Sequence, residues 1–112
     1  MFGRFAADVL DANVSVNMFT VPDACYGAIV NINLVNPHGT NDAVIELAYS
    51  MNAVGPDNED YIEKGAVIPA MGGVLERQKQ FLSPGECVFV KSNIAGVTVR
   101  IEGKLITEAR DQ

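Results

Sequence analysis

The segment between Gly73 and Glu102 constrains the fold of this chain more than any other. It contains three β-type segments, at 73–82, 87–91 and 97–102, and two sharp turns. No helix fits between these segments, and a parallel pair of strands needs a crossover of about a dozen residues or more. Neighbouring strands must therefore run antiparallel. The segment predicts an all-β fold.

Alternating apolar and polar residues predict further strands upstream. In 27–36, Val30, Ile32 and Leu34 should form an apolar inner face, with amides on the other face. The Ala, Glu and Leu of 43–50 also favour a helix, but we interpret this segment as a strand because its alternation has period two. The polar segment 74–82 is typical of an edge strand, and the two strands after it should be central. The expected strands are 14–21, 27–36, 43–50, 61–68, 74–82, 87–91 and 97–102.

Turn-forming residues separate these strands. The segment 36–42 holds proline, glycine, asparagine and aspartate, and we expect a hairpin loop there. The turn 83–86 has proline second and glycine third, the residue order of a type II turn, after which 87–91 should pair back. Seven to eight short strands at regular spacing predict an antiparallel β-sandwich, either immunoglobulin-like or a small jelly roll.

A chain of 112 residues is expected to form one domain. We divide it into an N-terminal arm, a sandwich and a C-terminal extension, which span 1–13, 14–103 and 104–112. Terminal arms of this kind either stay mobile or dock on a neighbouring subunit.

The composition excludes several classes of partner. A net charge of −6 disfavours direct binding to nucleic acid, because an acidic surface repels a phosphate backbone. No apolar run approaches the roughly 20 residues that span a bilayer, and residues 1–10 lack the apolar core of a secretory signal. We expect a soluble protein, synthesised in the cytoplasm, that binds no membrane. Cys25 and Cys87 show no obvious pairing, so we expect two buried thiols rather than a disulfide or a zinc site.

No arrangement of residues predicts an active site. His38 is the single histidine, and its place between Pro37 and Gly39 is that of a turn residue rather than of a base held by a third group. The acidic residues of 57–60 lack the order of an EF-hand calcium loop. We therefore predict no catalytic residues, no cofactor and no metal, and hence no enzyme.

Six short motifs follow one another along 19–103. They are Phe19-Thr20-Val21-Pro22, Ala28 to Asn36, Asp60-Tyr61-Ile62-Glu63, Gly73-Val74-Leu75-Glu76-Arg77, Leu82-Ser83-Pro84-Gly85-Glu86 and Gly96 to Gly103. Together and in this order they resemble a recurring group of small structural proteins from tailed bacteriophages. The resemblance implies a β-sandwich present in many copies on a virion and brings no catalytic residues. Members of that group end near the equivalent of Gly103, so 104–112 departs from their pattern.

The sandwich and the resemblance together lead us to expect a non-enzymatic, multi-copy virion protein. Capsid decoration or cementing is the first choice, and a tail, neck or baseplate component is the alternative. Its partners would be major capsid or tail proteins and further copies of itself. The arm 1–10 and the edge strand 74–82 are the candidate contact surfaces. The candidate contact residues are Phe2, Phe5, Val9, Leu10, Glu76, Gln78 and Gln80. Deletion of 1–10 should abolish incorporation and leave a folded domain.

Two further hypotheses come from other classes of protein. The first is a carbohydrate- or host-surface-binding module that uses loops 36–42, 52–60 and 93–96 at one end of the sandwich. Loss of glycan binding on substitution of Asp57 and Asn58 would favour it. The second is a small hydrolase, for which His38→Ala would be the control.

Overall fold

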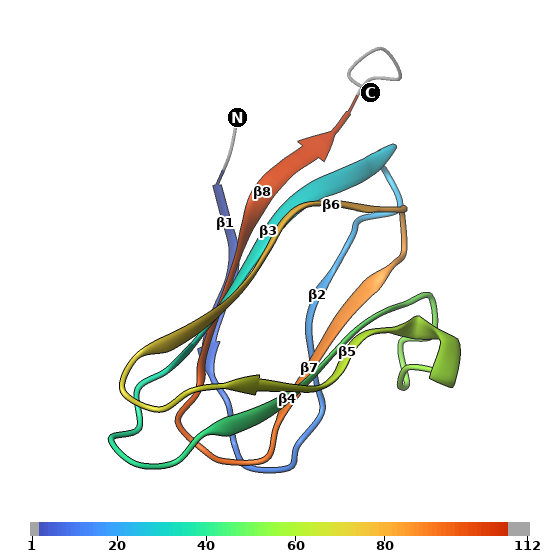
Figure 1. Ribbon diagram of the computed structural model, residues 1–112. Helices are drawn as coiled ribbons and strands as arrows, with labels where there is room; N and C mark the ends of the chain where they lie inside the picture. The colour runs from blue at the N-terminus through green and yellow to red at the C-terminus, as the bar shows by residue number, and fades with distance from the viewer. Residues whose placement is uncertain (1–2, 108–112) are drawn as a thin grey trace.

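The protein is a sandwich of two four-stranded antiparallel sheets (Figure 1). The structure is a computed structural model and describes residues 3–107. Sheet A contains, in spatial order, β1 (Gly3–Val9), β8 (Thr98–Ile106), β3 (Gly27–Asn36) and β6 (Gly73–Leu82). Sheet B contains β2 (Val16–Thr20), β7 (Cys87–Ser92), β4 (Ala43–Ser50) and β5 (Tyr61–Ile68). Within 3–107 the one helical element is the 3-10 turn η1 (Asn58–Asp60), and no helix there could cross a membrane.

The strand pairing is that of a jelly roll. Strand β1 pairs with β8, β2 with β7, β3 with β6 and β4 with β5. These four pairs correspond to one long two-stranded antiparallel ribbon that is rolled up into a sandwich. Pairs β3–β8 and β4–β7 then close the ribbon into two sheets. The structure confirms the predicted antiparallel sandwich and selects the jelly roll from the two alternatives.

The core lies between the sheets, where the predicted inner face of β3 is fully buried. Val30, Ile32 and Leu34 expose no surface, and Ile45 and Leu47 of β4 face them from sheet B. Strands β7 and β8 are central and β6 is an edge, as the sequence predicts. Alternation therefore identified correctly which side chains point inward.

Two predicted hairpins are wrong. The loop 37–42 joins β3 of sheet A to β4 of sheet B, and the turn 83–86 joins β6 of sheet A to β7 of sheet B, so neither connects a hydrogen-bonded pair. The side chain of Asn36 stabilises the connection from β3 to β4. Its buried amide donates hydrogen bonds to the carbonyls of Asn41 and Ile68. Turn chemistry predicts where the chain reverses but does not say which sheet it enters next.

The predicted N-terminal arm is also wrong for the residues that the structure describes. Residues 3–9 form β1, which lies along β8, and Leu10 is 2% exposed in the core. A bulge between Arg4 and Ala6 turns the adjacent Phe5 and Ala6 toward the core, which interrupts the alternation that would have revealed the strand. Deletion of 1–10 would therefore remove part of the sandwich. It would not leave the intact domain that the sequence led us to expect.

Strand β8 continues past the predicted end of the sandwich. It runs to Ile106, so 104–106 belongs to sheet A, whereas 108–112 lies outside the described residues. Glycine is required at Gly103 because a Cβ there would lie 2.1 Å from the backbone oxygen of Ile29. Cys25 and Cys87 are free thiols, of which Cys87 is buried and Cys25 half-buried.

Candidate interaction surfaces

The outer face of sheet A, which we call the A face, carries a largely apolar row of three valines and one threonine across its four strands, which we call the apolar row. The register places Val9, Thr98, Val35 and Val74 side by side. Val9 is 58% exposed and Val74 51% exposed, at the two edges of the sheet. Exposed apolar residues are common singly, but a contiguous row marks a surface suited to a partner.

A second row lies next to the first and is polar on β8, β3 and β6. Ala7, Arg100, Asn33 and Glu76 are neighbours across the same four strands. Arg100 forms an ion pair of 3.2 Å with Glu102 on its own strand. Between the two rows is an open hollow of about 490 Å³ whose lining includes Val9, Val35 and Arg100. The A face thus combines an apolar hollow with a charged border.

The structure brings some of the predicted contact residues to this face. Val9 and Glu76 lie on it, and exposed Gln78 donates a hydrogen bond to Glu76 over 3.3 Å. Two others are used inside the protein, which contradicts their role as anchors for a partner. Phe5 stacks on Phe19 of β2 with ring centroids 4.6 Å apart, and Leu10 is in the core. The predicted contact residue Phe2 lies outside the described residues.

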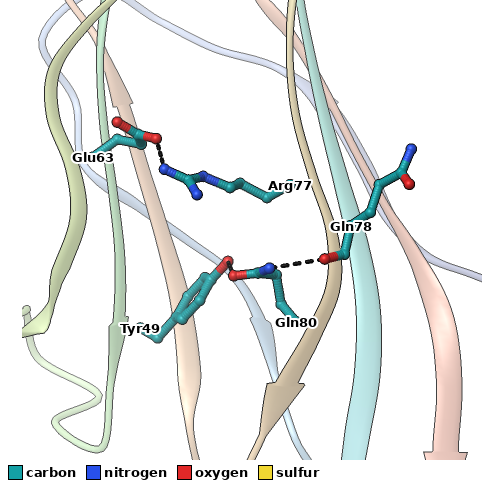
Figure 2. A network of polar contacts seen from close by, with 5 residues as sticks. All are labelled: Tyr49, Glu63, Arg77, Gln78 and Gln80. Carbon is teal, nitrogen blue, oxygen red and sulfur yellow. Dashed lines mark hydrogen bonds and ion pairs between the residues drawn. The ribbon is translucent and has the colours of Figure 1, made fainter.

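Gln80 also serves the sandwich itself. Figure 2 shows Arg77 and Gln80 of β6 pointing toward sheet B, whereas Gln78 points away from it. Tyr49 Oη of β4 donates to Gln80 Oε1 over 3.0 Å, and Gln80 Nε2 donates to the Gln78 carbonyl. Arg77 forms an ion pair with Glu63 of β5. These contacts link β6, an edge strand of sheet A, to β4 and β5 of sheet B.

Burial sets the electrostatics of this edge. It raises the pKa of Tyr49 from its ordinary 10.0 to about 12, with Arg77 lowering it and Glu86 raising it by smaller amounts. The neutral phenol is thus the favoured form between the sheets, consistent with its role as a hydrogen-bond donor.

The outer face of sheet B, which we call the B face, is built differently. Ala48 and Phe89, paired across β4 and β7, are 1% and 5% exposed and pack with Tyr61 and Cys87 into a second apolar cluster. Beside it is a pocket of about 190 Å³. Residues 54–56 of the β4–β5 connection form one wall, and the lining includes Ser15, Glu46, Ala48, Tyr61, Phe89 and Lys91. We call this hollow the B pocket.

Charged groups surround the B pocket in a fixed register. Glu46 lies directly opposite Lys91 on β7 and Lys64 on β5. Within residues 3–107, neither lysine forms an ion pair within 4 Å of this carboxylate. The Lys64 ammonium lies 4.5 Å from the centre of the Tyr61 ring. Desolvation raises the pKa of Tyr61, and Glu46 raises it further through its charge and a hydrogen bond.

The three loops predicted to act together do not share one end. Loops 36–42 and 93–96 meet, because His38 Nε2 lies 2.6 Å from the Ala95 carbonyl and donates to it. Loop 52–60 follows β4 at the opposite end, where Met51 lies beside Gly85. His38 therefore links two loops through a hydrogen bond. In the described part of the chain, no group of three histidine, cysteine or acidic side chains is placed to hold a metal ion.

The B pocket was missed from the sequence. Its polar side chains come from four separate segments, and the β4–β7 and β4–β5 registers bring Glu46, Lys91 and Tyr61 together. The outward position of Glu46 was the one available signal. No protein-family model and no curated protein sequence matches this chain.

Proposed function

We propose that this chain is a non-enzymatic structural protein of a tailed-phage virion, present in many copies, that decorates or cements the capsid through the A face. The six ordered motifs supply the class of protein. The jelly roll is compatible with it, since viral capsid domains use this fold, although lectin domains and cupins use it too. The observation that carries the proposal is the apolar row from Val9 to Val74 beside the open hollow.

The A face suits attachment to a repeated lattice. The hollow can accept an apolar side chain of a neighbouring subunit, and Arg100 in its lining can orient that subunit through charge. Each contact can be weak, because many copies on one particle add their contributions. Both edges of sheet A carry a bulge, at Arg4 to Ala6 in β1 and opposite Val30 to Ile32 in β6, which disfavours open-ended strand addition.

The first experiment is mass spectrometry and negative-stain microscopy of purified particles. We expect many copies per particle, seen as projections on the capsid. Particles that contain the protein only at the tail or neck would replace the capsid assignment by the alternative. Particles without it would refute a virion role.

The second experiment tests the surface. Val9→Asp and Val74→Asp should abolish binding of the full chain to particles that lack it, because each places a charge in the apolar row. Val67→Asp is the matched control: Val67 is 57% exposed but points outward from sheet B, opposite Val44. Equal binding by all three variants and the wild type would rule out the A face.

A further inference from the structure

The B pocket has the composition of a ligand site rather than of an ordinary solvated sheet face. Outward faces of antiparallel sheets are usually polar and wet. Here Phe89 and Ala48 form an apolar floor that is almost fully buried, next to the carboxylate of Glu46 and the ammonium of Lys91. Apolar surface and both kinds of hydrogen-bonding group therefore meet in one small hollow.

The polar groups are held in place by the fold. Glu46 and Lys91 sit on adjacent strands in direct register, and Tyr61 follows η1, which is closed by a capping box between Asp57 and Asp60. Asp57 N donates to the Asp60 carboxylate over 2.9 Å, which shapes the connection whose residues 54–56 form the pocket wall. Groups on rigid strands and a closed turn present a preformed surface to a ligand.

Size and charge narrow the class of ligand. A volume of about 190 Å³ is below the roughly 300–1,000 Å³ of sites for drug-sized molecules, so one small ring fits. Glu46 and Lys91 carry opposite charges in the lining, so the pocket as a whole favours neither an anion nor a cation, and a purely apolar molecule would leave both groups unpaired. What remains is a neutral compound with an apolar side and several hydroxyl groups.

We propose that the B pocket binds a single neutral pyranose unit, either free or as part of a surface glycan. The C–H side of the sugar ring lies toward the apolar wall residues Val54 and Pro56, Glu46 accepts hydrogen bonds from its hydroxyls, and Lys91 donates to them. Ser15 supplies a further hydroxyl at the edge. This binding goes beyond the proposed attachment to a virion, since the pocket and the A face lie on opposite outer faces of the sandwich.

The test is a titration of the full-length, isotope-labelled protein with methyl glycosides of glucose, galactose, mannose and N-acetylglucosamine, followed by two-dimensional NMR. We expect at least one of these probes to bind in the millimolar range and to shift the amide signals of Gly55 and Lys91. Glu46→Gln and Lys91→Met should each weaken binding by about tenfold or more. Lys104→Met is the matched control, since Lys104 is a half-buried lysine on sheet A, and it should bind as the wild type does.

Three results would overturn the inference. One is the absence of shifts with all four glycosides, which would make the hollow a water-filled space. Another is binding that persists unchanged in both Glu46→Gln and Lys91→Met. The third is tighter binding of acetate or galacturonate than of any neutral glycoside. Lys91→Met should still attach to particles, so a failure here leaves the virion proposal to be judged on its own.

Discussion

The A face and the B face are the outer sides of one sandwich, and both carry exposed valines, but the B face also buries an apolar cluster of its own. On the A face, Val9 and Val74 are more than half exposed. On the B face, Ala48 and Phe89 are almost fully buried in a cluster of their own. The comparison teaches that an outward side chain of a jelly roll can be either part of the fold or free for a partner. Substitutions on the two faces should therefore differ in what they damage.

The sharpest contrast is between the phenylalanines of the two faces. Phe89→Ala should lower the free energy of unfolding by about 3 kcal/mol, because it empties a buried cluster. Phe81→Ala, at a residue 52% exposed on the A face, should cost about 1 kcal/mol. Urea unfolding followed by circular dichroism measures both. Equal losses of unfolding free energy in the two variants would contradict the proposed difference between the faces.

A similar contrast separates two adjacent residues of the N-terminal segment. Leu10→Ala should destabilise the protein by about 3 kcal/mol, since Leu10 is in the core. Val9→Ala should change stability by less than about 0.5 kcal/mol, because Val9 points outward. Thermal unfolding of the two variants provides the measurement. If Leu10→Ala were as stable as the wild type, the segment would be an arm after all.

The edge that joins the sheets should show a smaller effect and a dependence on pH. Tyr49→Phe removes the bond to Gln80 and should cost about 1 kcal/mol at neutral pH. The unfolded chain loses this phenolic proton near pH 10 and the folded chain near pH 12. The stability contributed by the neutral phenol is therefore complete below pH 10 and is lost as the pH rises toward 12.

The difference in unfolding free energy between wild type and Tyr49→Phe is the informative quantity, because every other titratable group is common to both proteins. We expect the two unfolding free energies to converge as the pH rises from 10 to 12. A constant difference over this range would show that Tyr49 is not shielded between the sheets.

The smallest expected effect belongs to the cation beside Tyr61. Lys64→Met removes the ammonium over the ring and should lower stability by about 0.5 kcal/mol. The phenol pKa of Tyr61, followed by ultraviolet difference absorbance, should remain raised, because desolvation and Glu46 are its causes. A return to the ordinary value in this variant would contradict that assignment.

The sequence predicts the strands better than their neighbours. Period-two alternation identifies Val30, Ile32 and Leu34 as inward-facing, and the structure confirms it. The same alternation cannot show that β3 and β4 enter different sheets, because a turn has similar chemistry whether it closes a hairpin or crosses the sandwich. Strand β1 was overlooked because its bulge lets Phe5 and Ala6 face the core in succession.

For the candidate sites too, the sequence indicates individual residues but not which of them are neighbours. Val9 and Glu76 were selected as surface residues on separate segments, and only the pairing of β1, β8, β3 and β6 places them on one face. Lys91 and Glu46 are unremarkable polar residues until the β4–β7 register sets them opposite each other. Long-range register is the information that a single sequence does not carry.

The pairing of β1 with β8 has a consequence for how the protein is made. Among the described strands β1 has β8 as its sole partner, so the first of these eight strands to be synthesised can pair only after the last of them has been made. Until then the backbone hydrogen-bonding groups of β1 lack their partner strand, and folding of sheet A is completed only after translation of β8.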